Sequence, residues 1–294
     1  MRREDLESLL EQLSEAGWRA GKFRSLEKVA GGVHDAHRLR FESADIFLKT
    51  TRLENAVMLD DESEALTRLR ATGTIIAPRP LLNGVAGEIA YLALRWLELH
   101  PALPAAQQRL GRMLAALHRC EADRYGWERD NHIGLTRQRN AWSDNWCEFF
   151  IDRRLGFQLR RAESTSNNGW VRRGLELLDV LPRMLDGYQP AASMLHGDLW
   201  SGNMAMREDG EPVIYDPATH HGDRECDIAM TELFGGFSPA FYSAYEEEWP
   251  LDEGYADRRP LYQLYHVINH VNMFGGGYVK QASAMIEGLL ARFA

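Results

Sequence analysis

The chain has few cysteines, no excess of positive charge and no long apolar run. Each absence argues against one class of protein. Its three cysteines fit no metal-binding spacing, so we expect reduced thiols in a cytoplasmic protein. The formal net charge of −9 disfavours general binding to nucleic acid, which depends on basic surfaces. No apolar run approaches the ~18 residues of a membrane span, and residues 1–5 lead into an amphipathic segment rather than a signal peptide.

Hydrophobic patterning predicts a mixed first third followed by a mainly helical remainder. Early helices are expected at 4–15 and 56–69, and early strands at 23–30, 36–42 and 45–50. An apolar strand at 88–97 is expected after a turn at Asn83-Gly84. Further helices are expected near 104–120, 139–164, 168–186, 224–233, 238–248, 257–273 and 277–292. With 294 residues, the chain has room for two domains or lobes of about 150 residues each.

The most informative stretch is the run H-G-D-L-W-S-G-N at 196–203, followed by Asp216 in V-I-Y-D. Asp198 and Asn203 have the spacing of the catalytic loop of protein kinases. Phosphoryl transfer needs a base for the acceptor hydroxyl and oxygen ligands for Mg²⁺. Asp198 can supply the first, and Asn203 with Asp216 can supply the second. Asp, Asn, Gly and Ser are also common turn residues, so this motif alone fits a structural turn as well.

Upstream segments have the order of a nucleotide-binding lobe. A turn with Gly31 and Gly32 is followed by a strand that ends in Lys49 and by a helix that carries Glu62. In kinases a glycine-rich hairpin covers the phosphates, a strand lysine binds them, and a helix glutamate pairs with that lysine. Glu64 competes with Glu62, because a two-residue step turns a helix by about 200°. Taken singly, Lys49 and Glu62 also fit solvated positions, and the glycine pair is not a G-x-G-x-x-G.

Segments along nearly the whole chain resemble the fructosamine kinases, also called ketosamine 3-kinases. They include L-G-R-M-L-A-A-L-H at 110–118, N-H-I-G at 131–134 and N-W-C-E-F-F-I-D-R-R-L at 145–155. Later matches are the H-G-D-L-W-S-G-N run, D-P-A at 216–218, G-D-R-E-C-D-I-A-M-T-E-L-F-G-G-F at 222–237 and N-H-V-N-M-F-G at 269–275. The family shares the kinase-like fold of aminoglycoside and choline kinases. The resemblance implies an α+β bilobal fold, with an antiparallel sheet and a helix in an N-lobe at 1–97 and a larger, mainly helical C-lobe at 98–294.

The resemblance also implies the roles of the acceptor and metal residues. Asp198 is implied as the catalytic base that faces the sugar hydroxyl. Asn203 and Asp216 are implied as Mg²⁺ ligands. Trp200 and His270 are implied as groups around the ketosamine sugar.

The nucleotide side follows from the same resemblance. Lys49 is implied to bind phosphate, with Glu62 as its ion-pair partner, near a glycine loop that contains Gly31 and Gly32. The backbone of the hinge at Arg95 and Leu97 is implied to pair with the adenine of ATP. The loop lacks the oxidant-responsive cysteine that some family members carry, so a redox switch is not expected there.

The activity implied by the family is ATP- and Mg²⁺-dependent phosphorylation of the 3-hydroxyl of a ketosamine, a sugar joined to an amine after Amadori rearrangement. The phosphoester then decomposes and frees the amine, which makes this a deglycation repair activity. We expect a monomer that acts on small or protein-linked ketosamines of the fructosamine or ribulosamine type, with no nucleic-acid or membrane partner. The alternatives are a small-molecule kinase of the aminoglycoside or choline type and a non-catalytic nucleotide-binding scaffold.

Three other groups of polar residues are expected to be structural. Asp227, near a predicted helix start, is expected to accept hydrogen bonds from the backbone of the catalytic loop. His118 ends an apolar helix and is expected to pack in the core. His220 and His221, followed by Asp223, suggest a metal cluster, but neighbouring residues of an extended strand face opposite sides, which disfavours it.

Overall fold

The computed structural model describes residues 1–29, 32, 34–165 and 169–293, and it divides into two compact units. The first unit contains Met1–Ala106 together with Met204–Pro217, and the second contains Gln107–Asn203 together with Ala218–Ala294. A late hairpin thus joins the first unit, so that unit is discontinuous in sequence. The lobe boundary expected after residue 97 stays a prediction.

The first unit is built on a five-stranded antiparallel sheet. Its strands are β1 (Phe23–Val29), β2 (Asp35–Phe41), β3 (Ile46–Arg52), β4 (Pro80–Ala86) and β5 (Ile89–Arg95), in the order β1-β2-β3-β5-β4. Its helices are α1 (Arg3–Glu15), a short 3₁₀ turn η1 (Leu53–Asn55) and α2 (Ala56–Ala71). A small second sheet contains β6 (Leu99–His100), β11 (Met204–Arg207) and β12 (Pro212–Ile214).

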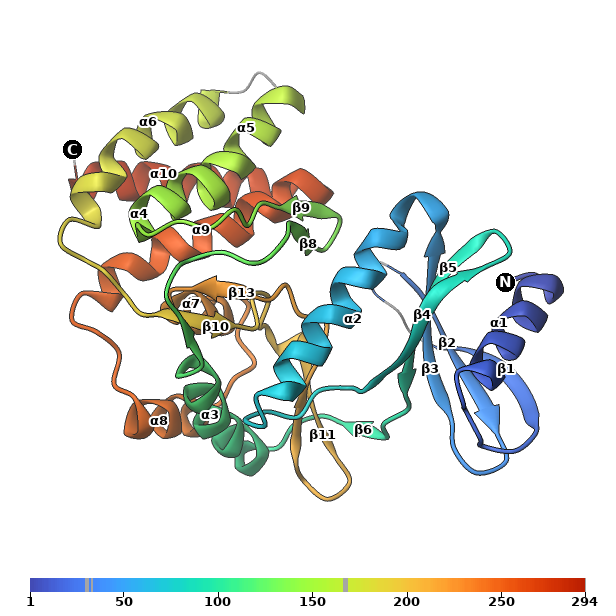
Figure 1. Cartoon of the computed structure of the whole chain (residues 1–294). Coiled ribbons are helices and arrows are strands. Elements are labelled where there is room, and N and C mark those ends of the chain that lie inside the picture. The colour runs from blue at the N-terminus through green and yellow to red at the C-terminus, as the bar shows by residue number, and fades with distance from the viewer. Residues whose placement is uncertain (30–31, 33, 166–168, 294) are drawn as a thin grey trace. The chain divides into compact units, whose positions relative to one another are not determined.

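Both faces of this sheet are covered by apolar packing, as Figure 1 shows for α1 and α2. Because side chains alternate along a strand, Tyr91 and Ala93 of β5 pack on the α1 side, while Leu92 and Leu94 pack on the α2 side. Because both of its faces are buried, β5 has almost no polar residue. Lys49 on the neighbouring strand β3 is also buried, so its charge needs an acidic partner.

The second unit is mainly helical. Its longer helices are α3 (Pro104–His118), α5 (Gly156–Thr165), α6 (Gly169–Met184), α7 (Glu225–Leu233), α8 (Pro239–Glu248), α9 (Tyr255–Phe274) and α10 (Gly277–Phe293). Its short elements are β7 (Glu121–Ala122), β8 (Asn131–Ile133), β9 (Thr136–Gln138), α4 (Trp146–Phe149), the π-helix η2 (Phe150–Leu155), β10 (Ala192–Leu195), η3 (Ser201–Asn203) and β13 (His220–Gly222). Helices α5, α6, α9 and α10 lie side by side around one apolar core (Figure 1).

Two predicted elements were wrong. The turn expected at Asn83-Gly84 lies inside β4, and the chain reverses at Gly87, whose φ is 60°. Asn83 was misleading because its side chain donates to Asp60 of α2 at 2.6 Å, a tertiary contact. The helix expected from residue 139 begins only at Trp146, because the Asn145 side chain accepts the Glu148 N–H at 2.9 Å and caps it.

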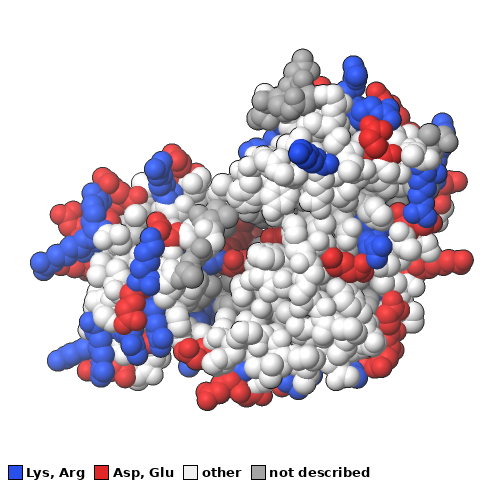
Figure 2. Space-filling model, turned by 180° about the vertical axis from the view of Figure 1, so that it is seen from behind, with Lys and Arg blue, Asp and Glu red and all other residues white. Residues whose placement is uncertain are grey.

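The surface and the helices give two further observations. None of the helices in the described part of the chain is both long and apolar enough to cross a membrane. On the face shown in Figure 2, Lys and Arg side chains are interspersed with Asp and Glu rather than collected in one basic area.

Candidate active site

Lys49 joins two carboxylates inside the first unit. Ile46 and Leu48 pack on the α1 side of β3, so Lys49 points to the other side, where α2 carries Glu62. Lys49 Nζ lies 2.7 Å from Glu62 Oε1 and 2.5 Å from Asp216 Oδ1. Lys49 and Glu62 are both buried. Of the two candidate glutamates, the structure therefore pairs Glu62 with Lys49.

The surroundings keep Lys49 charged. Burial alone would lower the pKa of Lys49, but attraction by Glu62 and Asp216 outweighs it and raises the pKa above its ordinary value. Burial raises the pKa of Glu62, and the charge of Lys49 opposes that effect. The pKa of nearby His34 is lowered by burial and then by the positive charge of Lys49, so its imidazole is neutral. A fixed ammonium of this kind suits an anionic phosphate.

Asp216 has an unusual backbone. Its φ of 57° is the only positive value among the non-glycine residues that the structure describes. Such a conformation costs about 1–3 kcal/mol and persists where the surrounding structure enforces it, often at functional sites. Here β12 is fixed on both sides, because it pairs with β11 and because Ile214 N–H donates to Ile76 O at 3.0 Å. The strain aims a carboxylate at Lys49.

In the second unit, Asp198 and Asn203 are bonded to one another. Asn203 Nδ2 donates to the backbone oxygen of Asp198 at 2.9 Å and to its Oδ2 at 3.4 Å. The NH₂ group of Asn203 is thus directed at Asp198, and an amide oxygen such as its Oδ1 is a donor type that Mg²⁺ accepts. Asn203 is buried, whereas the Asp198 side chain is 22% exposed. Partial exposure is what a side chain needs if a substrate hydroxyl is to reach it.

The two metal candidates flank one hairpin in the sequence. Asn203 directly precedes β11, and Met204 of β11 pairs with Ile214 of β12, two residues before Asp216. Amide and carboxylate oxygens are the donors that Mg²⁺ prefers, so the donor chemistry of this pair fits the ion.

Asp227 holds the catalytic loop from α7. Its carboxylate accepts the backbone N–H groups of His196 at 2.7 Å and Gly197 at 2.8 Å, which confirms the structural role expected for it. His118 Nε2 lies 3.2 Å from Asp227, and its Nδ1 lies 2.8 Å from the Tyr245 hydroxyl, so the expected core role of His118 is confirmed too. Gly197 has a φ of 85°, and an added Cβ would lie 2.1 Å from Ala218 O. This turn therefore requires glycine.

Sequence reasoning missed His266, which lies beside the expected base. Its side chain is 4% exposed, and its Nδ1 is 4.0 Å from Asp198 Oδ1 with no hydrogen-bond partner among the described atoms. Burial lowers the pKa of His266 to about 3, so the ring is neutral. The signal was its spacing, because His266 is one helical turn before His270 on α9.

Trp200 and His270, expected around the sugar, are linked through Phe234, a third ring that sequence reasoning also missed. The ring centroids of Trp200 and Phe234 are 6.2 Å apart, and those of Phe234 and His270 are 5.1 Å apart. His270 Nδ1 donates to the backbone oxygen of His266 at 2.8 Å, because a carbonyl can only accept. His270 Nε2, the other ring nitrogen, is therefore the one that can meet a sugar hydroxyl.

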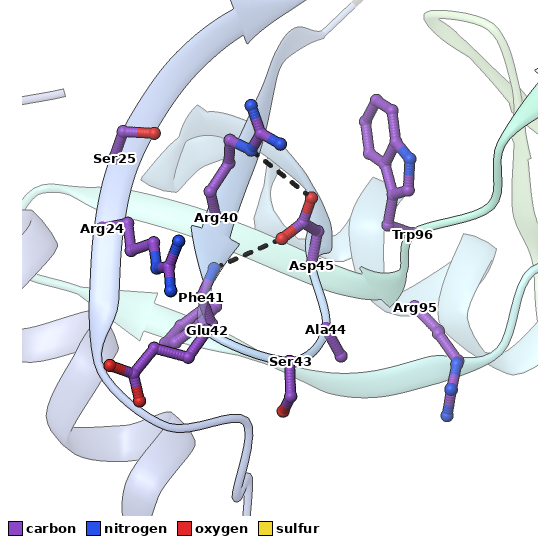
Figure 3. Close-up of a pocket in the computed structure, with 10 residues that line it drawn as sticks. All are labelled: Arg24, Ser25, Arg40, Phe41, Glu42, Ser43, Ala44, Asp45, Arg95 and Trp96. Atoms are coloured by element: carbon purple, nitrogen blue, oxygen red, sulfur yellow. Dashed lines mark hydrogen bonds and ion pairs between the residues drawn. The ribbon is translucent and has the colours of Figure 1, made fainter.

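The hinge candidates Arg95 and Leu97 lie at the end of β5 and just beyond it. Arg95 N–H donates to Arg79 O at 2.9 Å, so that N–H is already paired within the sheet. Arg95 also lines a polar cavity of about 580 Å³ at one end of the sheet (Figure 3), with Arg40 and Asp45. Lys49 is not among the residues that line this cavity.

Two other predicted groups can be placed. Gly32 is exposed, and Gly31 lies outside the described residues. His220 Nδ1 and His221 Nδ1 each lie 3.1 Å from a backbone oxygen, that of Ala218 and that of Ala192 respectively. Within the described part of the chain, no three His, Cys, Asp or Glu side chains gather to hold a metal.

The antiparallel sheet with its lysine–glutamate pair and the helical unit with its Asp–Asn loop define a kinase-like phosphotransferase fold of the α+β class. The sequence profile named fructosamine kinase matches residues 6–292, and the chain belongs to the fructosamine kinase family.

Individual relatives agree. A Synechocystis protein assigned as a probable ketoamine kinase is 39% identical over 286 residues, which cover 97% of this chain and 96% of that protein. The chloroplastic protein-ribulosamine 3-kinase of Arabidopsis thaliana is 35% identical, over 92% of this chain and 84% of that protein. The crystal structure of a Haemophilus somnus protein assigned as a fructosamine-3-kinase has a TM-score of 0.89 and 27% identity, over 97% of each chain.

Proposed function

We propose that the protein transfers the terminal phosphoryl group of ATP to the 3-hydroxyl of a ketosamine. Membership of the fructosamine kinase family supports this acceptor. The observation that carries the chemistry is the Lys49 ammonium, which is buried and held by Glu62 and Asp216 within 2.7 Å. A structural salt bridge would need one carboxylate, whereas a phosphate site needs a fixed cation and a metal-binding carboxylate together.

In the proposed mechanism, Asp198 orients the acceptor hydroxyl and accepts its proton as the oxygen attacks phosphorus. Asn203 and Asp227 keep Asp198 in place, the first through its side-chain amide and the second through the loop backbone. Lys49 balances the negative charge of the phosphates, and ADP leaves.

Asn203 and Asp216 are the proposed ligands of Mg²⁺. When bound, the ion neutralises charge on the phosphates of ATP. In this proposal the Asp216 carboxylate contacts both Lys49 and the metal ion, and its fixed backbone conformation orients it for both contacts.

Trp200 and His270 are the proposed contacts of the sugar. An indole face suits the C–H surface of a sugar or a cationic amine, and His270 Nε2 can form a hydrogen bond with a sugar hydroxyl. Phosphorylated ketosamines would release the amine, which makes repair of glycated amines the proposed physiological role. We also propose that the protein acts as a cytoplasmic monomer.

A substrate panel tests the proposal. ATP turnover is measured with fructosamines, ribulosamines, an aminoglycoside and choline at equal concentrations. We expect the ketosamines to give the highest kcat/KM. Turnover only with the aminoglycoside or choline would identify a different acceptor class, and ATP binding without any turnover would identify a scaffold.

A further inference from the structure

Five aromatic rings form a continuous strip in the second unit. Trp200 and Phe234 begin it, His270 continues it, and Phe274 and Tyr278 end it. His270 lies 5.1 Å from Phe234, 5.7 Å from Phe274 and 5.0 Å from Tyr278, measured between ring centroids. The rings come from the catalytic loop, the end of α7, the end of α9 and the start of α10, so the fold gathers them from distant parts of the sequence.

This strip is unusually open to solvent. Trp200 is 39% exposed, Phe234 is 38% exposed and Phe274 is 61% exposed. In the described part of the chain, these three are all the Trp and Phe side chains that reach such exposure. Scattered exposed apolar residues need no explanation, but exposed rings that touch one another mark a binding surface.

Glycines hold the rings in place. Gly235 and Gly236, with φ values of 70° and 95°, follow Phe234 directly, and Gly275 and Gly276 follow Phe274 with φ values of 64° and 61°. An added Cβ on Gly236 would lie 2.5 Å from Ser201 of the catalytic loop.

Trp200 is fixed over its own turn. An added Cβ on Gly202 would lie 2.2 Å from the Trp200 ring. The strip therefore packs against the catalytic loop and is preorganised in the absence of ligand.

The local charge favours a cation. The C-terminal ends of α7 and α9, which carry partial negative charge, lie at this strip and outnumber the one positive end there, the N-terminus of α10. The faces of aromatic rings attract cations as well. An ammonium with an apolar substituent matches both features.

We infer that the strip continues the ligand site past the proposed sugar contacts Trp200 and His270, and that its far end at Phe274 and Tyr278 binds the substituent of the ketosamine amine and selects aromatic or large apolar groups. The inference rests on the proposed function. Trp200 is two residues from Asp198, so a sugar at Asp198 has its amine at the near end of the strip. The substituent then extends along His270 to Phe274 and Tyr278. Phosphoryl transfer itself does not require these last two rings.

The test compares two substrates of equal charge, N-fructosyl-methylamine and N-fructosyl-benzylamine. The wild-type protein is expected to show the higher kcat/KM for the benzylamine compound. Phe274→Ala should lower the benzylamine-to-methylamine ratio of kcat/KM by roughly 2- to 13-fold, the range of one ring–ring contact, since a cation–π contact contributes equally to both substrates. Phe274→Tyr should restore the ratio, because it restores the ring.

Leu103→Ala is the matched control, because Leu103 is 59% exposed and lies outside the second unit. Its ratio should equal that of the wild type. A wild-type ratio near one, or a ratio unchanged in Phe274→Ala while the methylamine compound is still phosphorylated, overturns the inference and leaves the proposed function standing. If the wild-type protein phosphorylates neither compound, both the proposed function and the inference are overturned.

Discussion

Asp198 is the residue on which the proposed chemistry depends most. Asp198→Asn keeps the size of the side chain and removes the proton acceptor, so kcat should fall about 10²–10⁴-fold. ATP affinity should stay near wild type, because the proposed partner of Asp198 is the acceptor hydroxyl and not the nucleotide. Steady-state kinetics with a ketosamine, together with calorimetry of ATP binding, check both parts. The control is Asp144→Asn, since the Asp144 side chain is 82% exposed. Wild-type turnover in Asp198→Asn would remove Asp198 from the role of base.

Asp216 is the proposed residue whose loss separates metal binding from nucleotide binding. In Asp216→Ala, ATP affinity should no longer respond to Mg²⁺, because the carboxylate ligand is missing. Lys49 keeps its charge through Glu62, so some metal-independent ATP binding should remain. Calorimetry with and without Mg²⁺ measures this. A variant that still binds ATP more tightly with Mg²⁺, to the same extent as wild type, would contradict the assignment.

His266 should make the protein less stable in acid. Its pKa of about 3 in the folded chain lies below the ordinary 6.5, so the unfolded chain takes up this proton first as the pH falls. Its contribution to the free energy of unfolding should therefore decline below pH ~6.5, by about 1.4 kcal/mol per pH unit down to about pH 3.

The test compares urea unfolding of the wild type and of His266→Gln, which cannot titrate. Between pH 7 and pH 5, the wild type should lose about 2 kcal/mol more than the variant. Equal losses in the two proteins would show that His266 is not buried as a neutral ring.

At the scale of elements, α7 supports the catalytic loop through Asp227. Asp227→Ala leaves two buried N–H groups, those of His196 and Gly197, without their acceptor. Each unpaired buried group costs about 1–3 kcal/mol, so the variant should lose several kcal/mol of stability as well as turnover. Thermal unfolding and kcat are measured together. Asp257→Ala at an exposed position of α9, which loses only a surface ion pair with Arg292, should cost less than about 1 kcal/mol. Equal losses in the two variants would contradict this role.

Most elements could be predicted from the sequence, because their signals are local. Helix α1 was expected at 4–15 and spans Arg3–Glu15, and α9 was expected at 257–273 and spans Tyr255–Phe274. The failures had tertiary causes. Asn83 resembled a turn residue, yet it bonds α2 from within β4, and residues 139–145 resembled a helix, yet Asn140 donates to the backbone of Arg129 at 3.1 Å.

At the scale of the whole molecule, the sequence predicted the kinase-like α+β fold and the pairing of Lys49 with Glu62 or Glu64, because the motifs have fixed order and spacing. It could not predict the left-handed backbone of Asp216, which depends on strand pairing around it. Nor could it predict the aromatic strip, since its rings come together only when α7, α9 and α10 pack in the fold.

The central claim is that the chain phosphorylates a ketosamine on its 3-hydroxyl. The most direct measurement is phosphorus and proton NMR of the product formed from ATP and a fructosamine. We predict coupling of phosphorus to the proton on the third sugar carbon, and an initial rate of product formation at least about 100-fold lower with Asp198→Asn at the same enzyme concentration. Phosphate on another hydroxyl, or no phosphorylated ketosamine from the wild-type protein, would contradict the claim.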